Sequence, residues 1–86
     1  MNVQVKTKKV YDEIIDFIAG GTTPESVIAF QLSETAKERL QDLIEGTKTE
    51  GLSPEERKEL ETFLVLEHIM RMAKAKARIQ IKSKSE

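Results

Sequence analysis

The sequence predicts an all-α protein in which three short helices precede one long C-terminal helix, and it predicts a helical dimer. Apolar residues recur every three or four positions, which is typical of amphipathic helices. Ser or Thr before Pro or Glu marks several helix starts. Aromatic residues make up only 5% of the chain, which disfavours a β-sandwich or barrel. The 86 residues suffice for one domain, which we expect over residues 8–82.

The first helix is expected from about Lys8 to Gly20-Gly21, because a glycine just past the last apolar residue commonly ends a helix. Acidic residues occupy the other side of this segment. Residues 1–7 lack helix signals and are predicted to form a flexible arm, with a short strand that needs a partner as the alternative. The apolar residues of the first helix are Val10, Tyr11, Ile14, Ile15, Phe17 and Ile18.

The second and third helices each begin at a recognisable cap. Thr23 caps the second helix, which is expected over residues 24–30 with a proline at its first position. Ser33 caps the third helix, which is expected over residues 34–45 and is ended by Gly46. The residues predicted to face the core are Val27, Ile28 and Phe30 in the second helix, and Ala36, Leu40, Leu43 and Ile44 in the third.

The strongest local signal is the segment Ser53-Pro54-Glu55-Glu56, which opens the fourth helix. Its capping serine, its proline at the first helical position and its glutamate at the third form a capping box. No Gly or Pro follows, so the helix is predicted to continue to about Ile81, over roughly 43 Å at 1.5 Å per residue. Residues 83–86 are predicted to form a tail.

The long helix carries a wide apolar face, and three short helices of the same chain are expected to cover only part of it. The first and third helices are the expected partners within the chain. A second apolar side then remains for another molecule, so the sequence predicts a homodimer or a protein partner, and a homodimer is the preferred expectation. The predicted interface consists of Leu60, Phe63, Leu66, Ile69, Met70, Ala73 and Ala77.

The charges are distributed unevenly, although the net charge is only −1. The middle of the chain, residues 10–70, is acidic, whereas residues 71–86 hold six basic residues and one acidic residue. Such a basic end stabilises a helix C-terminus, and it also suits the phosphate backbone of a nucleic acid. The candidate nucleic-acid contacts are Arg71, Lys74, Arg78 and Lys82.

Residues that carry out chemistry are scarce. The chain has no Cys, which excludes disulfides and thiolate metal sites, fits a reducing compartment and predicts a cytoplasmic protein. The single imidazole, His68, has no ligand at a suitable spacing, because Glu67 points about 100° away from it on a helix. We therefore expect that the chain is not an enzyme and that it has no catalytic residue, cofactor or metal site.

The longest apolar run, residues 63–66, is too short to span a membrane, so no membrane partner is expected.

Two segments, VYDEIIDFIAGGTTP (residues 10–24) and LEHIMRMAKAKAR (residues 66–78), resemble a family of small bacterial proteins common in cyanobacteria. The resemblance covers about residues 10–79. Members of that family are often encoded beside a small HNH-type nuclease, so the resemblance implies an accessory or antitoxin-like partner of a nuclease. It carries no functional residue over to this chain.

The sequence as a whole favours a non-enzymatic protein-interaction module that forms a homodimer and binds a protein partner such as a nuclease. The acidic middle of the chain suits a basic partner, and the basic end suits an acidic one. The alternative is binding of a nucleic-acid backbone through the basic end of the long helix.

Overall fold

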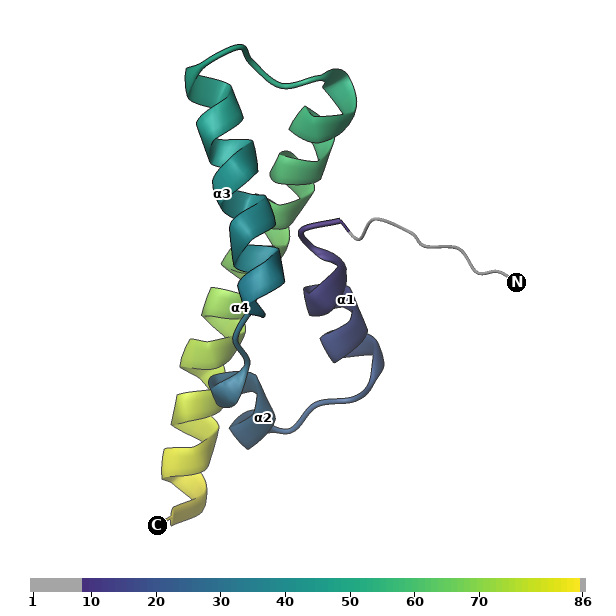
Figure 1. Ribbon diagram of the computed structural model, residues 1–86. Helices are drawn as coiled ribbons and strands as arrows, with labels where there is room; N and C mark the ends of the chain where they lie inside the picture. The colour runs from purple at the N-terminus through teal and green to yellow at the C-terminus, as the bar shows by residue number, and fades with distance from the viewer. Residues whose placement is uncertain (1–8, 86) are drawn as a thin grey trace, which may run out of the picture.

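The computed structural model describes residues 9–85, and these fold into four α-helices without a strand (Figure 1). This confirms the all-α class and the long C-terminal helix. The predicted arm, residues 1–7, lies outside the described residues. The helices are α1 (Asp12–Ala19), α2 (Pro24–Ala29), α3 (Glu34–Lys48) and α4 (Pro54–Ser85).

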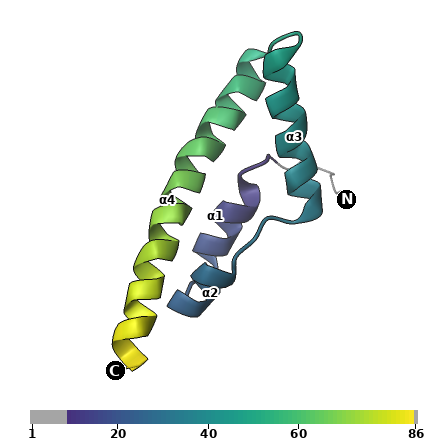
Figure 2. The same cartoon turned by 90° about the vertical axis from the view of Figure 1, so that its left-hand side faces the viewer.

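The long helix α4 is the surface against which the rest of the chain packs. Figure 2 shows α1, α2 and α3 all on one side of α4, whose opposite side is bare. The short helix α2 makes the closest contact with α4, whereas α3 approaches α4 mainly near the loop that joins them. The expectation that α1 and α3 would be the main partners of α4 was therefore incomplete, because α2 covers the C-terminal half that they do not reach.

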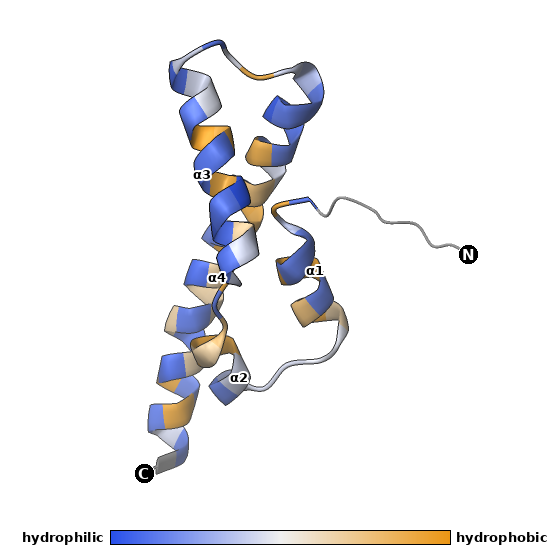
Figure 3. Ribbon diagram, viewed as in Figure 1, coloured by the Kyte–Doolittle hydropathy of each residue, from blue (hydrophilic) through white to orange (hydrophobic). Residues whose placement is uncertain are grey.

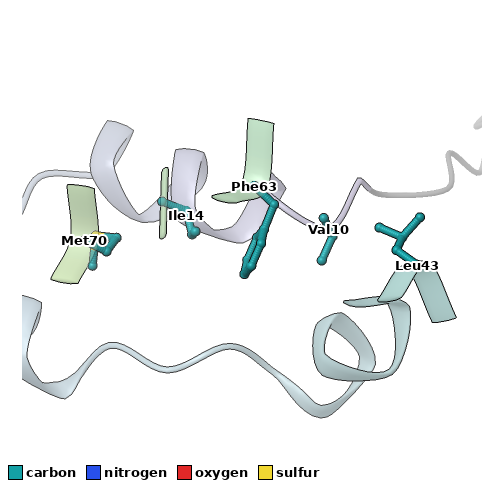
Figure 4. Close-up of a cluster of buried hydrophobic side chains, with 5 residues drawn as sticks. All are labelled: Val10, Ile14, Leu43, Phe63 and Met70. Carbon is teal, nitrogen blue, oxygen red and sulfur yellow. The ribbon is translucent and has the colours of Figure 1, made fainter. Parts of the chain in front are cut away.

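The core is a narrow band between α4 and the short helices. Five buried residues form it: Val10 and Ile14 from the start of the chain, Leu43 from α3, and Phe63 and Met70 from α4. Figure 4 shows these side chains in a row that runs from Met70 to Leu43. The N-terminal segment thus fills the space where α3 diverges from α4.

Side-chain caps fix the starts of α2, α3 and α4 as the sequence predicts, whereas α1 begins at Asp12, later than the expected start near Lys8, and has no side-chain cap. The Ser53 hydroxyl accepts a hydrogen bond from the Glu56 N–H at 3.1 Å, and the Glu56 carboxylate accepts one from the Ser53 N–H at 2.9 Å. This confirms the capping box of α4. A reciprocal pair of the same kind joins Thr23 and Ser26 at the start of α2.

Two helices run past their expected ends. The third helix continues through Gly46 to Lys48, so Gly46 is not its terminator. A Cβ atom at Gly46 would lie 2.7 Å from Cδ2 of Leu52, which shows that the glycine makes room for the returning chain. The reversal is made at Gly51, which has a φ of 87° and donates to the Gly46 carbonyl at 2.8 Å. The fourth helix continues to Ser85, four residues past Ile81.

Candidate functional site

An open groove of about 510 Å³ lies between α4 on one side and α3 with its preceding linker on the other. Its floor includes the core residues Ile14, Phe63 and Met70. Two of its wall residues are exposed to solvent, Leu64 at 52% and Ile44 at 37%. Further apolar side chains that line it are Phe30, Leu32 and Leu40. A mostly apolar concave surface with exposed large side chains is typical of a binding site.

The rim of the groove carries three cations, Lys37, Arg71 and Lys74, and one carboxylate, Glu67. Lys74 donates through Nζ to the Phe30 carbonyl at 2.8 Å, which ties the end of α2 to α4. Arg71 Nη2 donates to both Glu67 carboxylate oxygens, at 2.6 and 2.7 Å, and this pairing raises the pKa of Arg71. The rim is therefore positive overall.

A second apolar surface lies on the bare side of α4. It consists of Val65, Ile69, Met72 and Ile79, which are between 45% and 63% exposed, and we call it the outer stripe. Figure 3 shows hydrophobic residues continuing along α4 into its C-terminal part, where they alternate with hydrophilic ones. Leu64 and Val65 are adjacent in sequence, but they lie on different surfaces because successive helical residues point about 100° apart.

The predicted dimer interface falls largely on the inner side of α4. The short helices of the same chain cover this side, so most of its residues are not available to a second molecule. Among the predicted residues, Phe63, Met70 and Ala77 are buried, Leu60, Leu66 and Ala73 are half-buried, and only Ile69 is exposed. The apolar pattern of the sequence did not distinguish this inner face of α4 from the outer stripe.

The candidate nucleic-acid contacts lie together on the C-terminal half of α4. Arg71 and Lys74 belong to the rim of the groove and already have partners, as described above. Arg78 and Lys82 are exposed and form no ion pair with another described residue. Residues 68–85 contain no acidic residue, so this half of α4 is strongly positive.

Sequence reasoning missed the buried carboxylate of Glu59, whose side chain is only 2% exposed. It accepts hydrogen bonds from Arg39 Nε at 3.1 Å, from Arg39 Nη2 at 2.7 Å and from the Val10 N–H at 2.7 Å. The hydrogen bonds from Arg39 lower the pKa of Glu59, and burial opposes this effect. One sequence feature indicates that Glu59 faces inward. It lies four residues before Phe63, on the same side of α4 as the inner apolar face.

The described residues contain no group of three or more side chains that could hold a metal ion, and His68 is exposed on α4. None of the described helices combines the length and apolar character needed to cross a membrane. No family model matches this chain, and no curated protein or solved structure is similar to it.

Proposed function

We propose that this chain is a non-enzymatic, cytoplasmic protein-interaction module that binds a segment of a partner protein in the groove between α3 and α4. The observation that carries the proposal is the open apolar groove itself, with Leu64 and Ile44 exposed on its walls. Large apolar side chains exposed together in a concave surface are stabilised when a partner covers them. Self-association through α4 is the second part of this proposal.

The partner segment that fits best is an amphipathic helix with acidic residues beside its apolar face. The groove lies between helical elements and has an apolar floor, which suits the side chains of such a helix. The three rim cations Lys37, Arg71 and Lys74 outnumber the single carboxylate of Glu67, which favours acidic flanking residues. The resemblance to the cyanobacterial family supports a nuclease as the protein that supplies this segment, in an antitoxin-like complex.

A pair of neighbouring substitutions tests the groove. Leu64→Glu places a charge in the groove wall, and Val65→Glu places the same charge on the outer stripe at similar exposure. Tagged wild-type and variant chains are used to isolate partners from the native cell at low salt, with and without nuclease treatment. We expect one stoichiometric protein whose recovery falls at least tenfold with Leu64→Glu and is retained with Val65→Glu. Equal loss with both variants, or no effect of Leu64→Glu, would contradict the proposal.

Binding of a nucleic-acid backbone is the second candidate, and the unpaired cations of α4 favour it. Lys76, Arg78, Lys82 and Lys84 are exposed and form no ion pair with another described residue. Positive charge of this kind supplies most of the affinity for phosphates. This function predicts that the double variant Arg78→Glu/Lys82→Glu abolishes a mobility shift of duplex or single-stranded probes, and that Leu64→Glu does not affect it.

A further inference from the structure

We propose that two copies of this protein pair through the outer stripes of their α4 helices, antiparallel, with the two-fold axis passing between Ile69 and Met72. The proposal rests on the self-association part of the proposed function and specifies its surface and direction. It places the second copy on the side of α4 opposite the groove. Partner binding and pairing therefore use different surfaces.

The outer stripe has the spacing of a coiled-coil seam. Steps of four, three, four and three residues lead from Val65 through Ile69, Met72 and Lys76 to Ile79. This alternation keeps one side of a helix facing a partner helix. All four apolar members are substantially exposed, and α1, α2 and α3 lie on the other side of α4 (Figure 2). A second helix is the occupant that such a seam fits along its whole length.

The charges of α4 decide the direction of pairing. From residue 68 to residue 85 the helix carries six basic residues and no acidic residue. A parallel pair would bring these two basic halves together, with Lys76 of one copy facing Lys76 of the other within the seam. From residue 54 to residue 67 the helix carries five glutamates and two basic residues. An antiparallel pair places each basic half beside an acidic half, which makes a second copy complementary in charge.

The seam then selects one register. Ile69 of each copy faces Met72 of the other at the centre, and Val65 faces the aliphatic stem of Lys76. In this register Ile79 of each copy lies opposite Thr62 of the other, so the seam runs from residue 62 to residue 79 of both copies. The same register also brings Glu61 of each copy close to Lys82 of the other, so an ion pair closes each end. Registers shifted by one heptad in either direction move these two charges apart along the helix axis, so the ion pair favours this register.

The first test measures the dissociation constant of the dimer by sedimentation equilibrium. Wild type is expected to dimerise reversibly, and Met72→Glu to weaken the dimer at least tenfold while leaving the monomer folded, because Met72 is 54% exposed. Leu64→Glu, in the groove, is the matched control and leaves the constant unchanged. Glu61→Lys is expected to weaken the dimer severalfold, and Lys82→Glu in the same chain to restore it. A Met72→Glu variant that dimerises as tightly as wild type would overturn the proposed surface.

The second test uses disulfide formation, which is unambiguous because the chain has no cysteine. A mixture of Val65→Cys and Lys76→Cys chains is expected to form a mixed disulfide at least tenfold faster than either variant forms a disulfide alone. In the antiparallel register two copies of residue 65 lie about 16 Å apart along the axis, beyond the reach of a disulfide. Rapid cross-linking of Val65→Cys with itself would overturn the antiparallel arrangement only. A wild-type chain that stays monomeric at millimolar concentration would overturn self-association as a whole, and would leave the groove proposal standing.

Discussion

The carboxylate of Glu59 connects three parts of the chain that are distant in sequence. It accepts hydrogen bonds from the Val10 N–H before α1 and from Arg39 of α3, while belonging to α4 itself. Removal of one member of a buried, charged hydrogen-bonding group is costly, because the remaining donors lose a partner that solvent replaces only in part. Arg39 keeps a side-chain exposure of 33%, so water can compensate some of this loss on its side.

We therefore expect Glu59→Gln to lower the free energy of unfolding by about 1.5–3 kcal/mol at pH 7. A neutral amide has a single acceptor oxygen, and its NH₂ group would face the Arg39 guanidinium. Urea unfolding followed by circular dichroism measures the change. Glu55→Gln, at an exposed position in the first turn of the same helix, is the control and should change stability by less than about 0.5 kcal/mol.

The same pair predicts how stability depends on pH. The hydrogen bonds from Arg39 lower the pKa of Glu59 in the folded protein, so the folded state binds this proton more weakly than the unfolded chain. The stabilisation of the folded state by the ionised Glu59 is complete above the ordinary glutamate pKa of about 4.3. It is lost as the pH falls through the pKa of Glu59 in the folded protein. Between about pH 5 and pH 2, wild type should lose more stability than Glu59→Gln. The free energy of unfolding is measured by urea titration at each pH. If it falls equally with pH in the two proteins, Glu59 is not the source of this pH dependence.

The sequence pattern located most core residues and failed at this buried charge. Ile14 and Leu43 were expected inside because their spacing is apolar and helical, and both are buried. A charged residue is expected outside by default, and the position of Glu59 in phase with the inner face does not by itself identify its partners. Glu59 and Arg39 meet through the packing of α3 on α4, which no local pattern encodes.

At the scale of helices, local chemistry predicted the starts of the three capped helices well, and it missed the start of α1, which has no side-chain cap. The capping residues Thr23, Ser33 and Ser53 all act as expected, because a cap depends on residues within one turn. The end of α3 depends instead on how the chain returns towards α4. Leu52 packs over Gly46, so the glycine that looked like a terminator is a close-contact site.

The capping box of α4 gives an element-scale prediction. Ser53→Ala removes the acceptor of the Glu56 N–H and should lower stability by about 1 kcal/mol. Ser53→Asp supplies a carboxylate acceptor at the same place and should restore most of this loss. Thermal unfolding of the three proteins at one concentration provides the comparison, and an unchanged melting temperature in Ser53→Ala would refute the role of the cap.

At the scale of the whole molecule, the inner face of α4 packs against the other helices, and its outer stripe stays exposed and available to a partner. The apolar pattern of residues 63–72 surrounds most of the helix, so its period alone did not distinguish the inner face from the outer stripe. The distinction comes from α2, which packs against α4 and is tied to it at Lys74, and from Ala77, which is buried in the same half of α4. The fold class was thus predictable from the sequence, whereas the surface left for binding required the packed structure.

Two methionines, Met70 and Met72, lie two positions apart and therefore on opposite sides of α4, and they give a paired prediction. Met70 is 6% exposed, so Met70→Lys would bury an unpaired cation and should cost more than about 3 kcal/mol, enough to unfold much of a small domain. Met72 is 54% exposed, so Met72→Lys should cost less than about 0.5 kcal/mol. Circular dichroism at a concentration where the chain is monomeric measures both. Similar losses in the two variants would contradict the division of α4 into inner and outer faces.

The position of α4 at the end of the described chain has a consequence for synthesis on the ribosome. The segments α1, α2 and α3 are translated first, yet the side chains that cover them, Phe63 and Met70, come from α4. Short helices without a packing partner are marginal in water. The nascent chain therefore gains its core only after Met70 has left the exit tunnel, and the earlier helices remain open to chaperones until then.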